Sequence, residues 1–441
     1  MLEDLRFGVY RFLMRAKEPV FLPEFKGGVL RGAFGTVFKQ IACSRSRGLD
    51  KVIVASDFEP ERKVPGHGHA ISATAASGLT ESYGSNNSRA PGTYPTSFQE
   101  KSSGQEGQPG SDIEFTEFTE CDEDFSEDDE VEELQETGGK KLPEDSAENR
   151  SRARERTSRR EERPCRHCPV ATGCVYKAIF EPSPPPGSER LKNLEDIPRP
   201  FVFRIPPDPR RILNPDELLI WEIVLIGNAI GTLPYFIVTF KEIGEIGFGL
   251  WHDGRRSKAH LEAVHSVNPF DQTAFRIYSG NTNTVDLSRH IEITGEDIMA
   301  EAKKLPRDFI MVEFKTPTRM RYQSRYVEVP EFHVLIRNLL RRLSTLSYFY
   351  QGKEVNLDFQ GLISRASKVR INASDLTWKP WLRYSGRSKT RMDFGGFIGK
   401  VWYEGPLEEF LPLLVYGTLS NVGKTATFGL GQYTLGKSRT R

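Results

Sequence analysis

The end of the chain, Asn421-Val-Gly-Lys-Thr-Ala-Thr-Phe-Gly-Leu-Gly-Gln-Tyr433, combines Gly423, Gly429 and Gly431 with Lys424. Glycine lets a backbone approach a phosphate closely and present bare N–H groups, and lysine adds a mobile positive charge. A helical pattern over 406–420 ends where this loop begins. Because a nucleotide P-loop needs a helix N-terminus, this loop is not one. It is either a phosphate contact or a tight glycine turn before a final strand.

An earlier stretch repeats this order of elements. Residues 232–243 have a helix-like apolar pattern, and Gly244-Glu-Ile-Gly-Phe-Gly249 follows. A strand-like stretch with Arg255, Arg256 and Lys258 comes next. Two copies of helix, glycine loop and strand indicate a duplicated domain.

Four cysteines have a spacing that suits a metal. Cys165, Cys168 and Cys174 follow a long polar tract, and Cys43 lies just before that tract. If the tract loops out, all four meet at its base. They then suit structural zinc or an iron–sulfur cluster, with His167 as a substitute ligand. The alternative is free thiols in a reducing cytoplasm. We expect Cys121, inside the tract, to bind no metal.

The formal net charge of +1 hides an uneven distribution. Residues 112–136 hold fourteen Asp or Glu and no Lys or Arg, so the rest of the chain sets 61 basic residues against 46 acidic ones. A balance of this kind indicates a polyanion partner, although a solvated surface would have the same composition.

The sequence shows no sign of a membrane protein. Glu3 and Asp4 stand where a signal peptide would be basic, and no apolar h-region follows them. The uncharged run 223–240 contains Gly227, Gly231 and Pro234, which favour a buried strand, a turn and a helix over a membrane span. We expect a cytoplasmic protein without membrane contact.

The apolar patterns predict the elements that position these residues. Strands are expected over 5–22, 200–205, 216–227, 257–280, 284–294 and 394–403, and residues 308–320 are expected to be a strand that leads into a turn at Thr316-Pro-Thr318. Helices are expected over 29–43, 232–243, 295–304, 330–350 and 407–420. Each half then reads strand, helix, strands, helix, strand, the βαββαβ order of ferredoxin-like and RRM domains. The fold class predicted is α+β, with two tandem ferredoxin-like domains.

A long insertion interrupts the first predicted domain. Residues 58–160 are rich in Ser, Gly, Glu and Arg with few aliphatic residues, so they cannot bury enough apolar surface to order. The acidic run is either a cover for a basic groove or part of a solvated surface loop. The predicted boundaries are 1–57 and 161–300 for the first domain, 58–160 for the disordered insertion, and 305–441 for the second domain.

Several motifs together resemble one RNA-processing family. They are Leu22-Pro-Glu-Phe-Lys-Gly-Gly-Val-Leu-Arg-Gly-Ala-Phe-Gly, Phe314-Lys-Thr-Pro-Thr-Arg, the 332–343 helix with Arg341-Arg342-Leu343, Arg383-Tyr-Ser-Gly-Arg, the 394–401 strand, and the terminal glycine loop. The chain resembles the CRISPR-associated precursor-crRNA processing endoribonucleases, the sixth Cas family of the RAMP superfamily. The resemblance covers nearly everything outside 58–160 and is strongest from Phe309 onward.

This resemblance implies a function. It implies two tandem ferredoxin-like domains that bind CRISPR repeat RNA in a basic cleft. It also implies metal-independent cleavage of precursor crRNA by 2′-hydroxyl attack, which leaves a 2′,3′-cyclic phosphate and a 5′-hydroxyl. The alternative within the superfamily is a non-catalytic RNA-binding subunit that joins other Cas proteins in an effector complex. A third hypothesis is a zinc-stabilised adaptor that acts through the acidic insertion.

Such cleavage needs a proton acceptor, a proton donor and positive charge beside the phosphorane. Many relatives place a histidine on the first helix, but residues 29–43 contain none. His333 is the first alternative, since it shares a helix face with Arg337 and Arg341. His252 is the second, and Lys39 is a weaker proton-transfer group. His260, His265 and His290 are expected to be structural or exposed.

The RNA contacts are predicted from basic and glycine-rich motifs, because arginine binds phosphates and stacks on bases. A solvated basic face is the alternative. The predicted contacts are Arg31, Arg319, Arg321, Arg383, Arg387, Lys389, Gly423, Lys424, Gly429 and Gly431.

Overall fold

The first β-strand and the helix after it show how the sequence sets the fold. In the computed structural model, β1 (Arg6–Ala16) alternates buried and half-buried side chains toward its end. Helix α1 (Gly27–Ala42) buries Leu30, Phe34 and Phe38 on its apolar face. Because the strand alternates with period two and the helix with period 3.6, both turn one apolar side toward a shared core.

The structure describes residues 4–43, 165, 168–185, 188, 197–384 and 391–437. The predicted insertion, 58–160, therefore lies outside the described residues. All described residues belong to one compact unit. No described helix is long and apolar enough to cross a membrane.

An antiparallel sheet forms the centre of the first half. Its strands lie in the order β10-β9-β8-β1-β5-β3, and β11 pairs with β1. Their bounds are β3 Phe201–Arg204, β5 Leu218–Ile226, β8 Ala259–Val267, β9 Ala274–Ser279, β10 Thr284–Val285 and β11 Ile293–Thr294. Two short pairs flank it, β2 (Val20–Phe21) with β4 (Ile212–Leu213) and β6 (Phe248–His252) with β7 (Arg255–Ser257).

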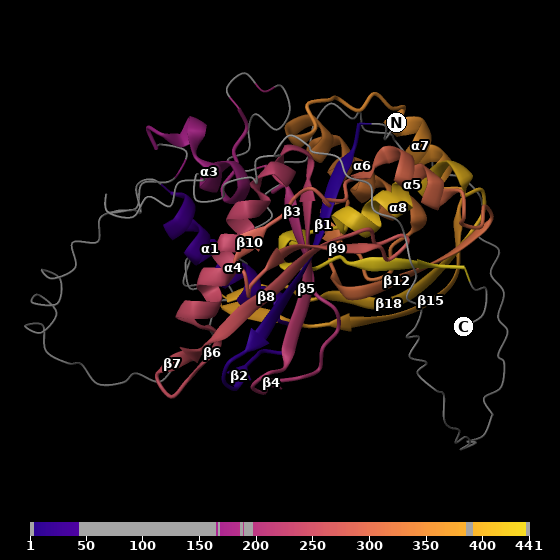
Figure 1. The fold of residues 1–441 in the computed structure, drawn as a ribbon. Helices are drawn as coiled ribbons and strands as arrows, with labels where there is room; N and C mark the ends of the chain where they lie inside the picture. Colours follow the sequence, from indigo (N-terminus) through magenta and orange to yellow (C-terminus); the bar gives the residue numbers. More distant parts are fainter. Residues whose placement is uncertain are drawn as a thin grey trace, which may run out of the picture. The chain divides into compact units, whose positions relative to one another are not determined.

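The helices of the first half cover one face of this sheet. Helices α1 and α4 (Leu233–Ile246) pack side by side on it (Figure 1). A short helix, α3 (Val175–Phe180), packs on α1. The core between them is dense in aromatic rings, with Phe34 in ring contact with both Phe236 and Phe240.

A second antiparallel sheet forms the centre of the other half, in the order β15-β18-β12-β19. Its strands are β12 Phe309–Thr318, β15 Arg370–Lys379, β18 Gly396–Glu404 and β19 Tyr433–Gly436. Two hairpins project from it, β13–β14 (Arg321–Tyr322, Arg325–Tyr326) and β16–β17 (Leu382–Tyr384, Arg391–Asp393). The helices are α5 Gly295–Ala302, α6 Phe332–Tyr350, α7 Phe359–Ala366 and α8 Leu411–Ser420.

The predicted α+β class is confirmed, with antiparallel sheets. Both sheets share one strand arrangement, because β8-β1-β5-β3 and β19-β12-β18-β15 each place the fourth, first, third and second strands of a βαββαβ series side by side. Phe7 and Val9 of β1 join one apolar core with residues of α6 and α8. The predicted tandem domains and their boundaries stay predictions.

Some predicted elements were wrong in detail. Gly244 lies inside α4, because that helix continues to Ile246 and ends against Gly247, so the loop predicted to start at Gly244 starts later. The predicted turn at Thr316-Pro-Thr318 is part of β12, where the pairing with β18 shifts register. Helix α7 and strand β15 had no prediction, since β15 alternates mostly polar side chains with no apolar stripe.

Candidate functional site

The terminal glycine loop is folded tightly against the chain's own backbone. Helix α8 ends at Ser420, and the Val422 N–H donates to the carbonyl of Gly431 at 3.0 Å. Gly423, Gly429 and Gly431 all have positive φ, and a Cβ on them would meet the carbonyl oxygens of Arg319, Phe203 and Val422 respectively. The structure thus requires these glycines for close packing of the loop. Their predicted contact with a phosphate stays a prediction.

The loop also connects the two halves of the chain through Phe428. The Arg31 guanidinium of α1 lies 4.1 Å from the Phe428 ring and 4.7 Å from the Phe180 ring. Arg31 is 9% exposed, although the sequence places it opposite the apolar stripe of α1. The reason is that α3 and the 3₁₀ turn Ala426–Phe428 cover that side of the helix. Arg31 therefore acts in packing here.

Arg319 holds the start of the loop to two neighbouring segments. Its Nε donates to the Gly395 carbonyl at 2.9 Å, and its Nη2 lies 2.7 Å from Asp393 Oδ2. Its guanidinium also stacks 4.6 Å from the Tyr326 ring, and its carbonyl accepts from the Lys424 N–H at 3.0 Å. With 12% of its side chain exposed, Arg319 mainly positions Lys424 and the β13–β14 hairpin.

His333 lies on the other side of that hairpin. Its ring contacts the Tyr322 ring edge at 5.1 Å, and its Nδ1 lies 3.3 Å from Glu331 Oε2. Arg337, one turn further along α6, places its guanidinium 5.7 Å from the same Tyr322 ring. Burial lowers the pKa of His333; Glu331 opposes this shift and Arg337 adds to it. The imidazole is therefore neutral at pH 7 and suited to accept a proton.

The β13–β14 hairpin lies between residues predicted from separate motifs. On one face, His333 and Arg337 contact Tyr322; on the other, Arg319 contacts Tyr326, and the Arg319 carbonyl accepts from the Lys424 N–H. The pairing sets Tyr322 opposite Arg325 and Tyr326 opposite Arg321, so the two tyrosines point to opposite faces. The Arg321 guanidinium lies 5.2 Å from the Tyr326 ring. We call His333, Tyr322, Arg321, Tyr326, Arg319 and Lys424 the hairpin cluster.

The other two catalytic candidates have different surroundings. His252 stacks on Phe21 at 4.0 Å, and its Nδ1 lies 3.1 Å from Asp253, all within the first half. Lys39 lies in the last turn of α1, close enough to Cys165 to affect the pKa of that thiol. His333 borders the same hairpin as Arg321, one of the predicted RNA contacts.

The remaining basic predictions lie on or beside β16. Arg383 belongs to that strand and pairs with Met392, and only its backbone is described. Arg387 and Lys389 fall outside the described residues. These contacts stay predictions.

The four cysteines lie around the adjacent ends of α1 and α3. Cys43 caps α1, Cys174 precedes α3, and the Cys168 N–H donates to the Cys165 carbonyl at 3.1 Å. Burial and a hydrogen bond with Glu181 raise the pKa of Cys165 to about 12. Within the described residues, no three Cys, His, Asp or Glu side chains form a set that could hold a metal. The zinc site stays a prediction.

Comparison with family models identifies the family to which the second half of the chain belongs. Residues 312–433 match the model described as CRISPR-associated endoribonuclease Cas6. The chain carries a Cas6-family domain. The resemblance seen in the sequence is thereby confirmed, and the hairpin cluster lies wholly within this Cas6-family domain. Residues 5–63 and 154–290 match a second model, described only as an N-terminal domain, and this match is interrupted over most of the predicted insertion. No curated protein matches the chain.

Solved Cas6 structures show a weaker likeness. A Cas6 product complex has a TM-score of 0.38 at 16% identity over 56% of this chain and 85% of the other. Thermus thermophilus Cas6 has a TM-score of 0.34 at 14% identity over 54% and 78%. A partial Cas6–RT–Cas1–Cas2 complex has a TM-score of 0.37 at 16% identity, over 54% of this chain and 39% of that one. Scores this low carry no argument about function.

The sequence reasoning missed the aromatic half of the hairpin cluster. Tyr322 and Tyr326 lie beside Arg321 and Arg325 in Arg321-Tyr-Gln-Ser-Arg-Tyr326. Gln323 and Ser324 both have positive φ, which is typical of a two-residue type I′ hairpin turn. The alternation of Arg and Tyr around a short polar turn was the signal available for this basic, aromatic hairpin.

Proposed function

We propose that this protein is an endoribonuclease that binds CRISPR repeat RNA and cuts precursor crRNA without a metal ion. One observation carries the proposal: a histidine whose pKa is lowered by burial and several cations border the same hairpin inside the Cas6-family domain. The family supplies the substrate class, and the cluster supplies groups of the kind that this chemistry needs.

The proposed reaction begins with His333. If its Nδ1–H donates to Glu331, its Nε2 is left as the proton acceptor. Nε2 takes the proton of a 2′-hydroxyl, and the 2′-oxygen attacks the adjacent phosphorus. The bond from phosphorus to the 5′-oxygen breaks, and that oxygen receives a proton from the imidazolium or from water. The products are a 2′,3′-cyclic phosphate and a 5′-hydroxyl.

Positive charge beside the phosphate would come from the hairpin and the loop. Arg321 and Arg325 lie on the hairpin, and Lys424 follows Gly423 at the start of the loop. Guanidinium and ammonium groups stabilise the charge that develops on a phosphorane. Arg319 touches Tyr326 and the Lys424 backbone, so we assign it a positioning role rather than a phosphate contact.

One observation favours the alternative, a non-catalytic RNA-holding subunit. Only 13% of the His333 side chain is exposed, so its ring reaches a 2′-hydroxyl only if the hairpin moves or RNA displaces Tyr322. In that case Arg321, Arg325 and Lys424 would bind RNA without cutting it. Other Cas proteins would then be partners of this subunit.

A cleavage assay in EDTA separates the two functions. The full chain is mixed with a labelled CRISPR repeat, and with the same repeat carrying a 2′-deoxy nucleotide at the cut site. We expect a cyclic-phosphate product that the 2′-deoxy nucleotide abolishes. His333→Gln should remove cleavage and keep RNA binding, whereas His252→Gln should keep both. Tight binding without cleavage would refute the enzyme and support the RNA-holding subunit.

A further inference from the structure

A row of charged side chains crosses five strands of the first sheet. Arg204 of β3 lies opposite Glu222 of β5, which lies opposite Arg11 of β1. Arg11 also faces His265 of β8, which faces Arg276 of β9. Directly opposite residues of antiparallel strands point to the same face of a sheet. We call these five residues the cross-strand row; it lies on the face opposite α1 and α4.

The positive charges of the row outnumber its negative charges. Glu222 is its only carboxylate, with Arg11 Nη2 at 2.8 Å from Oε1 and Arg204 Nη1 at 3.5 Å from Oε2. Arg276 is exposed, and its partner across the β8–β9 pairing is His265. Burial and the cations Arg276 and Arg11 lower the pKa of His265, so the charges of the row at pH 7 are three guanidiniums and one carboxylate. An anion bound to the row would neutralise the excess positive charge.

One end of the row holds a buried donor without an acceptor. The Nε atom of Arg204 is buried without a hydrogen-bond partner, its Nη1 lies 3.5 Å from the Glu222 carboxylate, and its side chain is 13% exposed. A buried donor without an acceptor costs stability. Oxygen atoms of a phosphate are the acceptors that a guanidinium fork fits best.

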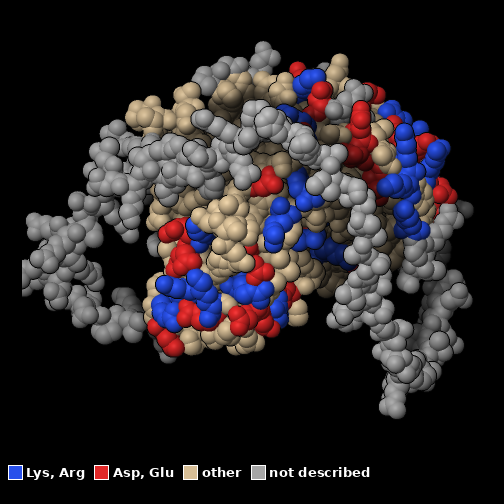
Figure 2. All heavy atoms as spheres, viewed as in Figure 1, with Lys and Arg blue, Asp and Glu red and all other residues tan. Residues whose placement is uncertain are grey.

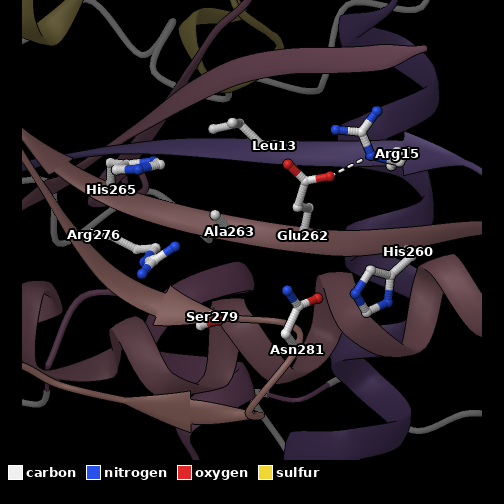
Figure 3. Close-up of a pocket in the computed structure, with 9 residues that line it drawn as sticks. All are labelled: Leu13, Arg15, His260, Glu262, Ala263, His265, Arg276, Ser279 and Asn281. Atoms are coloured by element: carbon white, nitrogen blue, oxygen red, sulfur yellow. Dashed lines mark hydrogen bonds and ion pairs between the residues drawn. The ribbon is translucent and has the colours of Figure 1, made fainter. Parts of the chain in front are cut away.

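A hollow of about 470 Å³ adjoins the other end of the row (Figure 3). Its floor is formed by the small side chains Ala263 and Ser279, which pair across β8 and β9. Figure 3 shows His265 and Arg276 at one end of the hollow and the ion-paired Arg15 with its partner Glu262 at the other. The small floor leaves room for a ligand between Arg276 and the ion-paired Arg15.

Spacing decides between catalysis and binding in this hollow. His260 and His265 both line the hollow. Two histidines can serve as the proton acceptor and the proton donor of RNA cleavage without a metal. A β-bulge lies between His260 and His265, and their partners on β1, Arg15 and Arg11, are four residues apart, so at about 3.3 Å per residue they stand roughly 13 Å apart along the strand. Two groups that act on one phosphate must each lie within about 3 Å of it. The hollow is therefore suited to binding.

We propose that the cross-strand row and its adjoining hollow bind the phosphate backbone of single-stranded RNA. The proposal rests on the proposed function, which makes RNA the substrate. Neighbouring strands are about 4.8 Å apart, so the row extends for roughly 19 Å, enough for several nucleotides. Figure 2 shows Lys and Arg atoms in the middle of the face toward the viewer. Figure 1 shows the first sheet from the same direction. No Phe, Tyr or Trp side chain belongs to the row or the floor, so this surface is suited to contact the RNA backbone rather than the bases.

The test measures binding of the full chain to a labelled, unstructured oligouridylate at several salt concentrations. The variant is Arg11→Ala with Arg276→Ala; Glu222 keeps Arg204 as a partner. Each lost phosphate contact lowers the slope of log K against log salt by about 0.7 for a single strand. We expect the slope to fall by roughly 1.4, with binding weakened at least about tenfold. The control is Lys241→Ala with Lys368→Ala, two exposed lysines outside the row, which removes the same charge. It should leave the slope unchanged.

A thermal melt separates binding from structure. A purely structural row would make Arg276→Ala less stable than the parent, whereas an exposed RNA-binding cation predicts an unchanged Tm. Equal RNA affinity and slope in parent and variant would overturn the proposal, even if the parent cuts CRISPR repeats. Loss of binding in the variant would support it, even if the parent fails to cut. A parent that binds no RNA would overturn both proposals. Polyglutamate binding with the same loss in the variant would assign the row to an acidic protein partner and overturn the RNA assignment.

Discussion

Replacing Arg319 with alanine tests whether this arginine positions the hairpin cluster or contacts RNA directly. The sequence predicts an RNA contact, whereas the structure directs the guanidinium toward Gly395, Asp393 and Tyr326. Truncating a positioning residue lowers the stability of the protein, because the partners of that residue are left without it. Truncating a phosphate contact instead lowers the affinity for RNA and the salt dependence of RNA binding.

The expected loss of stability follows from the three contacts. A hydrogen bond from a charged donor to the Gly395 carbonyl contributes about 1.5–2 kcal/mol. Asp393 is 46% exposed, so its ion pair contributes at most about 1 kcal/mol after screening. Stacking on Tyr326 adds about 0.5 kcal/mol. Arg319→Ala should therefore lower the free energy of unfolding by roughly 3 kcal/mol.

Urea unfolding and RNA binding measure the two effects. Arg325→Ala is the matched control, because it removes one cation from an exposed position of the same hairpin and should cost less than about 0.5 kcal/mol. Cleavage should fall with Arg319→Ala while the salt slope of RNA binding stays as in the parent. A slope lower by about 0.7, with a stability loss under about 1 kcal/mol, would show a phosphate contact and refute the positioning role.

Three further predictions test the loop, the helix and the histidine. Gly431→Ala puts a Cβ against the Val422 carbonyl at a φ of +69°, so it should destabilise by about 3 kcal/mol. Gly254→Ala, at a φ of +75° with no atom within 4 Å, should cost only about 1 kcal/mol, and equal urea midpoints would contradict the close approach. Arg31→Ala should lower stability by about 1–2 kcal/mol by removing both ring contacts, and an unchanged Tm would speak against its packing role. Burial lowers the pKa of His333, so its share of stability is complete above pH 6.5 and is lost as the pH falls through its folded pKa. The urea midpoint should therefore fall less between pH 7.5 and 5.5 in His333→Gln than in the parent, and identical falls would refute this burial effect.

The order of strands and helices was largely predictable, since it follows from local periodicity. Helix α6 has a leucine stripe at helical spacing, and its observed bounds lie within two residues of those predicted. Strand β15 was missed because its exposed, polar residues carry no alternation of apolar side chains. Its pairing with β18 is a long-range backbone contact, which no local pattern reports.

The sequence by itself determined the Cas6-family resemblance, the α+β class and the candidate chemistry of His333, because these depend on residue types and short spacings. The contacts that each cation makes became visible only in the tertiary structure. Arg31 and Arg319 look alike as basic residues of family-like motifs, yet both are held in protein contacts by segments far away in the chain. Arg11, His265 and Arg276, which no motif marked, come together because antiparallel register places them opposite one another. Burial and register are properties of the folded chain, so a charge acquires its role only when its neighbours are in place.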